Sequence, residues 1–205
     1  MNNALGMLEL GSIAAGIEAC DFMVKAARVD LLRAVTLCPG KYMVIVAGDV
    51  GDVRASMDAG VKNAGEHVVD TLFIPNIHPQ LIPAVSMTSQ VARFGAIGAL
   101  EFFSVASAIT AGDVAAKAAN ITLIEIRTGY AVGGKGFVTL TGDVGAVRAA
   151  VEAAAKNAEL LVATTLIPKP SPLLIQSLLY RQRLPIRQNQ ARIFKEEYVN
   201  VSGIN

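Results

Sequence analysis

The sequence has few of the side chains from which disulfide frameworks and metal sites are built. Its 205 residues include two cysteines, Cys20 and Cys38, and two histidines. Two thiols do not make the disulfide framework of a small secreted domain, and they favour a reducing, cytosolic setting. His67 and His78 have no arrangement of acidic or thiol ligands around them that resembles a zinc site, so we expect them at the surface or in an interface.

Charge is also scarce. Charged residues make up 17% of the chain, below the usual ~25%, and the net charge is +1. This balance gives no electrostatic basis for binding nucleic acid. Apolar residues make up 53%, yet no stretch approaches the ~18 apolar residues of a membrane span. We expect neither a membrane span nor, because Met1-Asn2-Asn3 is not basic, a signal peptide. A chain this apolar predicts large subunit interfaces.

The chain contains one pattern twice. Residues 4–12, ALGMLELGS, return as residues 96–104, AIGALEFFS. Further correspondences follow in the same order: Lys25 with Lys117, the Gly-Asp-Val-Gly segments 48–51 and 142–145, and the Ile-Pro pairs 74–75 and 167–168. Each copy is the size of a small domain and far longer than a solenoid unit. Two fused copies of one domain usually replace two separate chains in a symmetric assembly.

Each copy predicts the order strand, helix, strand, strand, helix, strand, which indicates an α+β fold. We place the first domain in residues 1–86, a linker in 87–94, the second domain in 95–180 and a disordered C-terminal tail in 181–205. The tail has no counterpart in the first copy and is rich in Arg and Gln.

Propensity and turn residues predict the individual elements. We expect Ser12 and Asp49 to be helix N-caps, and the apolar residues Ile13, Ile17 and Val24, together with Cys20, to face the core of the first domain. The expected strands are 4–10, 31–36, 42–47, 68–74, 96–102, 121–126, 137–141 and 160–167, and the expected helices are 12–27, 49–65, 104–119 and 143–158.

Several linked segments resemble the bacterial microcompartment shell domain. They are residues 4–9, 25–29 and 48–53 in the first copy, and 117–121 and 142–147 in the second. The resemblance covers about residues 4–180. It implies two tandem shell domains of ferredoxin-like type, with an antiparallel sheet and helices, in a trimer that looks like a hexamer. It also implies a structural tile, not an enzyme, in a microcompartment shell in the cytoplasm, with other shell proteins at its edges.

Within this family the chain looks most like the tandem shell proteins of the propanediol-utilisation type that carry an iron–sulfur cluster. The turn Cys38-Pro39-Gly40-Lys41 carries this closer match. It implies one [4Fe–4S] cluster per homotrimer, held on the threefold axis by three Cys38 thiolates, which serves electron transfer or cluster delivery across the shell and involves encapsulated redox enzymes as partners. Judged from the residue alone, Cys38 is a cysteine that lines or packs a loop, and Cys20 is a core residue.

Two other functions remain open. In the first, the tile holds no cofactor, and the turns of both copies line a central metabolite pore. In the second, the chain is a trimeric nucleotide-binding signalling protein, whose phosphate contacts would come mainly from Lys41 and Lys135. The pore-lining candidates are Pro39, Gly40, Lys41, Tyr130, Ala131, Val132, Gly133 and Gly134.

The resemblance also implies tile-edge residues, which are Lys25, Lys117, Asn76, His78 and Lys169. From the residues alone, both lysines are expected at solvated helix ends, with nothing acidic patterned around them. Asn76 and Lys169 stand where the family pattern has arginine. The Gly-Asp-Val-Gly segments lack the ending of a phosphate-binding loop and are explained by Asp N-caps. Glu9 and Glu101 repeat because the domain repeats, and we expect no catalytic pair.

Overall fold

The computed structural model describes residues 3–129, 132–156 and 158–183. The chain divides into two compact units, residues 1–170 and 171–205, and both copies of the repeated pattern lie in the first unit. Among the described residues, no helix is long and apolar enough to cross a membrane.

The first repeat, from β1 to β4, forms a four-stranded antiparallel sheet in the order β2-β3-β1-β4. This βαββαβ arrangement is ferredoxin-like, as expected. The elements are β1 (Ala4–Leu10), α1 (Ile13–Ala26), β2 (Asp30–Leu37), β3 (Lys41–Gly48), α2 (Val50–Ala64), the short 3-10 helix η1 (Gly65–His67) and β4 (Val68–Pro75).

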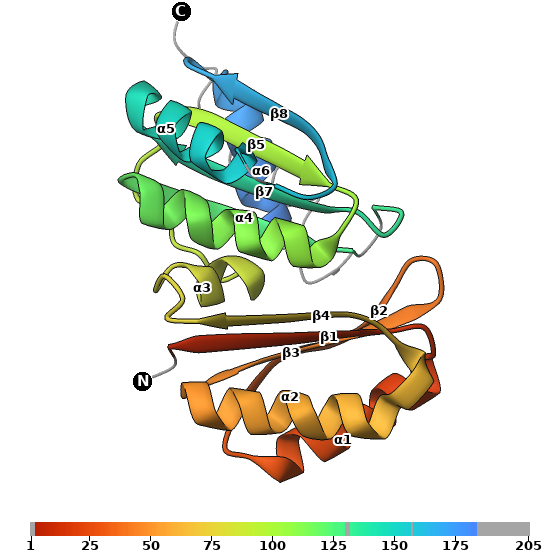
Figure 1. The fold of residues 1–205 in the computed structure, drawn as a ribbon. Helices are drawn as coiled ribbons and strands as arrows, with labels where there is room; N and C mark the ends of the chain where they lie inside the picture. Colours follow the sequence, from red (N-terminus) through yellow and green to blue (C-terminus); the bar gives the residue numbers. More distant parts are fainter. Residues whose placement is uncertain (1–2, 130–131, 157, 184–205) are drawn as a thin grey trace, which may run out of the picture. The chain divides into compact units, whose positions relative to one another are not determined.

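The second repeat, from β5 to β8, has the equivalent strand order β6-β7-β5-β8, and Figure 1 labels its strands β5, β7 and β8. Its elements are β5 (Ala96–Phe102), α4 (Val105–Ala118), β6 (Ile121–Thr128), β7 (Gly136–Gly142), α5 (Val144–Ala155) and β8 (Leu161–Ile167). The predicted α+β duplication is therefore confirmed.

Two helices follow the repeats and have no place in the expected list of elements. Helix α3 (Leu81–Val85) follows β4, and α6 (Pro172–Arg183) follows β8. Helix α3 is five residues long and contains Pro83, so it is too short to produce a helical hydrophobic period. Helix α6 crosses the expected boundary at residue 181, and residues 184–205 of the expected tail lie outside the described residues.

The four long helices of the two repeats begin in two different ways, at a serine or at an aspartate. Ser12 and Ser104 are N-caps, and their hydroxyls accept hydrogen bonds from the backbone N–H groups three residues later, at 3.3 and 3.2 Å. Asp49 and Asp143 occupy N-cap positions, but neither side chain makes the capping hydrogen bond. The expectation of Asp caps is therefore right in position and wrong in its chemistry.

A glycine in the first strand of each repeat lets a helix lie close to the sheet. A Cβ at Gly6 would lie 2.7 Å from Cγ of Met57 on α2, and one at Gly98 would lie 2.8 Å from Cγ2 of Val151 on α5. Real Cβ atoms do not approach other atoms so closely, so a larger residue would displace these side chains or the helix that carries them. This close packing explains why the glycine recurs in both copies.

Helices cover both faces of the first sheet (Figure 1). One face packs on α1 and α2 through a core that includes Leu8, Met23 and Val46. The opposite face carries Met7 and Met43, which belong to a larger core shared with α3, α4 and the second repeat. The two repeats thus share buried apolar surface.

The expected apolar stripe on α1 is wrong in its direction. Cys20 is buried, as expected, but Ile13, Ile17 and Val24 are all exposed. The buried positions of this helix are Gly16, Ala19, Cys20 and Met23. Helical spacing correctly marks an apolar face, but most of that face points away from the core of its own repeat.

Candidate functional site: the cysteine turn and the assembly surfaces

The turn between β2 and β3 presents the one exposed thiol of the chain. Cys38 is free and exposed, and it follows directly after Leu37, the last residue of β2. The Cys38–Pro39 peptide bond is cis, and Gly40 has a φ of 75°, which only glycine adopts without strain. The predicted turn is thus a tight hairpin that holds Cys38 at its tip.

The corresponding turn of the second repeat lies directly beside it. A Cβ at Gly134 would lie 2.8 Å from the carbonyl oxygen of Cys38, and one at Gly129 would lie 2.5 Å from Cδ2 of Leu37. Figure 1 shows these two hairpins on the same side of the structure. The structure therefore places the turn that holds Pro39, Gly40 and Lys41 beside the turn that holds Val132, Gly133 and Gly134, with the contact made at Gly134, while Tyr130 and Ala131 lie outside the described residues.

The lysine that follows each turn is paired with the repeated glutamate of the first strand. Lys41 Nζ contacts Oε1 of Glu9, and Lys135 Nζ lies 2.9 Å from Oε1 of Glu101. The Lys135 ammonium also lies over the ring of Phe103, 5.1 Å from its centroid. Both ammonium groups are thus already engaged by carboxylates, which explains why the glutamates recur and disfavours a role for either lysine in binding phosphate.

The other thiol is chemically isolated from this turn. Cys20 lies on the buried face of α1, and burial raises the pKa of its thiol, with a further contribution from the Asp21 carboxylate. Only Cys38 therefore combines exposure with a position on a loop.

The described residues of one chain do not supply enough ligands for a cluster. Among the described residues there is no group of three or more His, Cys, Asp or Glu side chains that could hold a metal ion. Iron–sulfur clusters are normally held by several thiolates. The residues therefore fit such a cluster only where copies of the chain bring several Cys38 side chains together.

The expected edge residues fall into two groups. His78 and Lys117 meet at Asp113: the His78 N–H donates to Asp113 Oδ1 at 2.7 Å, and Lys117 pairs with the other carboxylate oxygen. Lys25 and Lys169 are exposed at the surface. Asn76 follows the end of β4 and has a positive φ of 55°.

The expectation that nothing acidic accompanies the two lysines is wrong. Lys25 pairs with Asp21 and Lys117 with Asp113, each one helical turn earlier. Asp21 and Asp113 occupy the same position in the two repeats, and this repetition was the available signal in the sequence.

The junction between the repeats packs one face of α4 against the first sheet. Val105, Ile109 and Ala116 are all buried there, in the same core as Met7 and Met43. Alignment of the repeats places the exposed Ile13, Ile17 and Val24 at the positions of these three α4 residues. For example, Ile109 is 0% exposed whereas its counterpart Ile17 is 57% exposed.

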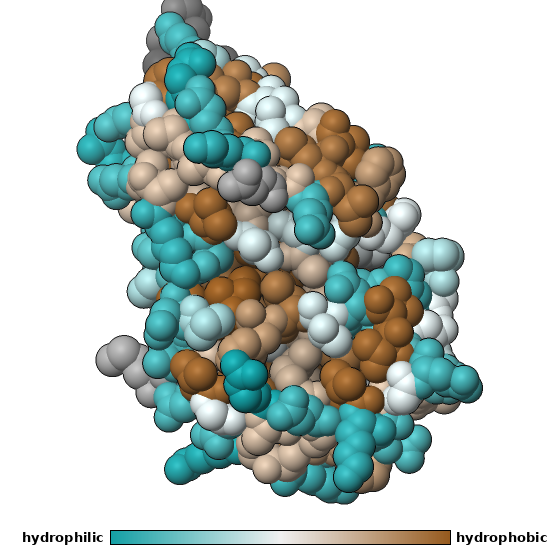
Figure 2. Space-filling model, viewed as in Figure 1, coloured by the Kyte–Doolittle hydropathy of each residue, from teal (hydrophilic) through white to brown (hydrophobic). Residues whose placement is uncertain are grey.

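The second sheet carries the complementary surface. Its residues Ala99, Phe137 and Thr165 align with Met7, Met43 and Leu72 of the first sheet, and they line a shallow hollow of about 310 Å³. Figure 2 shows apolar side chains at the surface of both repeats. Within the described part of residues 3–170, there is thus one completed helix-on-sheet junction and one uncovered copy of each of its two sides.

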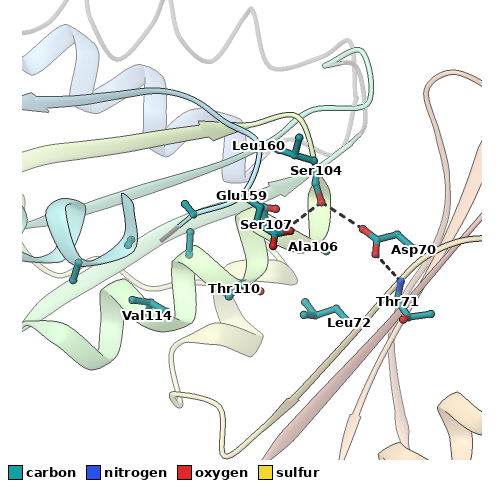
Figure 3. A pocket seen from close by; sticks show the side chains of 14 residues that line it. Asp70, Thr71, Leu72, Ser104, Ala106, Ser107, Thr110, Val114, Glu159 and Leu160 are labelled. Atoms are coloured by element: carbon teal, nitrogen blue, oxygen red, sulfur yellow. Dashed lines mark hydrogen bonds between the residues drawn. The ribbon is translucent and has the colours of Figure 1, made fainter. Parts of the chain in front are cut away.

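A pocket of about 500 Å³ lies within the completed junction, between β4 and α4 (Figure 3). Its polar lining includes Asp70, Ser104, Ser107, Thr110 and Glu159, and none of its lining residues is basic. Asp70 is engaged, because its carboxylate accepts hydrogen bonds from the Thr71 N–H at 2.8 Å and from the Ser104 hydroxyl at 3.5 Å. This acidic lining does not suit the phosphates of a nucleotide.

Comparison with known proteins decides the family. The BMC domain model matches the chain twice, over residues 4–77 and 96–170. The chain belongs to the BMC-domain family of bacterial microcompartment shell proteins. The resemblance expected from the repeated segments is thus confirmed.

Some relatives match a span that includes both repeats, and others match a span the length of one repeat. The shell protein PduT of Citrobacter freundii is 43% identical over 173 residues, which cover 83% of this chain and 94% of that protein. The carboxysome shell protein CcmK2 of Synechocystis is 39% identical over 100 residues, 46% of this chain and 97% of its own length. A solved microcompartment protein from Desulfitobacterium hafniense is 45% identical with a TM-score of 0.83, covering 86% of this chain and 99% of that one.

Proposed function

We propose that this BMC-domain chain is a structural tile of a bacterial microcompartment shell, and that it closes into a ring of three copies. The observation that carries the proposal is the unfilled copy of the internal junction. The exposed face of α1 on one chain fits the second sheet of the next as α4 fits the first sheet within a chain. Such a head-to-tail contact closes a ring of three when each copy is rotated by a third of a turn from the one before it. Three two-domain chains then form a tile of six domains.

The ring is tested by a charge placed on the exposed face of α1. The full chain should have three times its own mass of 21.4 kDa in light scattering at micromolar concentration. Ile17→Asp should leave a folded monomer, because Ile17 is exposed within one chain but would be buried between two. Val144→Asp is the matched control, since Val144 is also exposed on a helix but lies outside both surfaces. A monomeric parent chain would contradict the proposal.

We further propose that the ring holds one [4Fe–4S] cluster on its axis through Cys38 of each copy. Support comes from three facts on this chain: Cys38 is exposed, it stands at a hairpin tip, and Cys20 is buried in the core. Such a cluster supplies one-electron transfer when bound, and the tile would use it to pass electrons across the shell or to deliver the cluster. In the proposed ring, the turns of three copies would each bring one Cys38 thiolate to the axis. Pro39 and Gly40 would keep the backbone of each turn close to its thiolate.

The cluster is tested by iron and sulfide analysis with electron paramagnetic resonance after anaerobic purification. Cys38→Ser should remove the iron and leave the trimer assembled, whereas Cys20→Ser, its control, should keep the iron. Full iron content in Cys38→Ser would contradict the assignment. An iron-free parent protein from iron-replete cells would favour the cofactor-free tile, whose pore would be lined by the adjacent turns of the two repeats.

A further inference from the structure

The segment after β8 repeats the segment after β4. In both, a leucine stands seven residues after the isoleucine of the Ile-Pro pair: Leu81 after Ile74, and Leu174 after Ile167. In both segments the N–H of this leucine donates to the residue three positions earlier, although to a different acceptor atom. The Leu81 N–H donates to the His78 carbonyl at 2.9 Å, and the Leu174 N–H donates to the Ser171 hydroxyl at 3.2 Å. The start of α6 is thus the counterpart of α3.

The first of these segments, which includes α3 and the residues just before it, packs and hydrogen-bonds against the second repeat. Leu81 is fully buried in the core that the repeats share. The backbone N–H of His78 donates to the carboxylate of Asp113 on α4, and this carboxylate is only 6% exposed. A buried carboxylate that accepts a backbone hydrogen bond is a strong anchor.

Gln80 adds a second attachment, on the edge of the second sheet. Its side-chain amide donates to the Ile121 carbonyl at 2.9 Å and accepts from the Leu123 N–H at 2.7 Å. Strand β6 is an edge strand of its sheet. The amide thus pairs with this edge as the backbone of a further strand would.

The first repeat carries a surface equivalent to the one that holds α3 and the residues before it on the second repeat. Asp21 is the counterpart of Asp113, and its side chain is 54% exposed. Strand β2 is the corresponding edge strand, and Leu31, the counterpart of Leu123, is exposed. The second segment carries the matching apolar group, because Leu173, which replaces Gln80, is 76% exposed.

We infer that residues 171–175 of one chain dock on the next chain of the ring, at the end of α1 and the edge of β2. This inference rests on the ring proposed above. The Ser171 N–H donates to Asp21 of the next chain, as His78 does to Asp113. Leu174 enters the apolar surface beside α1, and Leu173 covers Leu31. The occupant of this surface is a second copy of the chain.

A disulfide between chains tests the contact directly. In a Cys20→Ser, Cys38→Ser background, Leu31→Cys combined with Leu173→Cys should give covalent dimers and trimers on a non-reducing gel after mild oxidation. The control pair, Val61→Cys with Leu173→Cys, should stay monomeric on the same gel, because Val61 lies on α2. A trimer in solution whose Leu31→Cys, Leu173→Cys form gives only monomeric bands would overturn the inference and leave the ring intact.

Two truncations provide an independent measurement. A chain ending at Arg183 should form trimers like the full chain. The trimer of a chain ending at Pro170 should dissociate at a protein concentration at least tenfold higher. Equal dissociation of the two truncated chains would overturn the inference, and a monomeric full chain would overturn the ring as well. A lower melting temperature of the isolated monomer after truncation at Pro170 would show instead that the segment packs within its own chain.

Discussion

The α-carbon of Gly134 lies so close to the carbonyl of Cys38 that a Cβ there would be 2.8 Å from the carbonyl oxygen. The second repeat thus supports the thiol-bearing turn of the first. Gly134 has a φ of 81°, so its backbone is also unsuited to other residues.

Gly134→Ala should displace the Cys38 turn. We expect a loss of about 2 kcal/mol in the free energy of unfolding, from the left-handed backbone and the collision together. Gly133→Ala is the control: its φ is 63°, but a Cβ there would meet nothing within 4 Å, so only the backbone contribution of about 1 kcal/mol remains. Urea unfolding measures both, and equal losses would show that the contact has no effect.

The two thiols should react at very different rates. In iron-free folded protein, iodoacetamide at pH 8 should modify Cys38, while Cys20 should react only after unfolding. Burial shields Cys20 and raises the pKa of its thiol, so in the folded chain less of it is the reactive thiolate at pH 8 than of an ordinary thiol. Peptide mass mapping of the labelled chain gives the site, and rapid labelling of Cys20 would contradict its placement in the core.

The two repeated lysines should differ in their effect on stability. Lys25→Ala should change the free energy of unfolding by less than about 0.5 kcal/mol, because Lys25 and Asp21 are both exposed. Lys117→Ala should cost about 1–2 kcal/mol, because it removes the partner of the largely buried Asp113. Following the family, both changes should weaken the formation of sheets of tiles, as seen by electron microscopy. A loss for Lys25→Ala as large as that for Lys117→Ala would contradict the exposure of the Lys25–Asp21 pair.

Gln80 should stabilise the joined repeats. Gln80→Ala leaves the Ile121 carbonyl and the Leu123 N–H without their side-chain partner, and we expect a loss of about 1–3 kcal/mol. Gln90→Ala, at an exposed loop position, should change little. Thermal unfolding followed by circular dichroism compares the two, and identical melting temperatures would mean that water replaces the amide without loss.

Because the domain is duplicated, most of its strands and helices can be predicted from the sequence. The first strands were predicted with their observed bounds, 4–10 and 96–102, and the Ser12 cap was predicted with its chemistry. Each weak local signal occurred twice in the same order, so one copy supported the other. The short helix α3 was missed, because five residues are less than two helical turns.

The direction of the α1 stripe could not be predicted in the same way. A period of 3.6 residues shows that one face of a helix is apolar, but it does not show what covers that face. Ile17 is exposed while its counterpart Ile109 is buried by the other repeat. The contact between His78 and Asp113 was also beyond the sequence, because it depends on how the repeats pack.

The unequal turns of the two repeats have a consequence for stoichiometry. A ring of six identical domains would carry six copies of every turn, so any change at the axis would occur six times. Here Cys38 occupies one turn and a glycine-rich segment occupies the other. In the ring proposed above, fusion of the two domains would let alternate positions around the axis diverge, with a Cys38 turn in three sectors and the glycine-rich turn in the three between them.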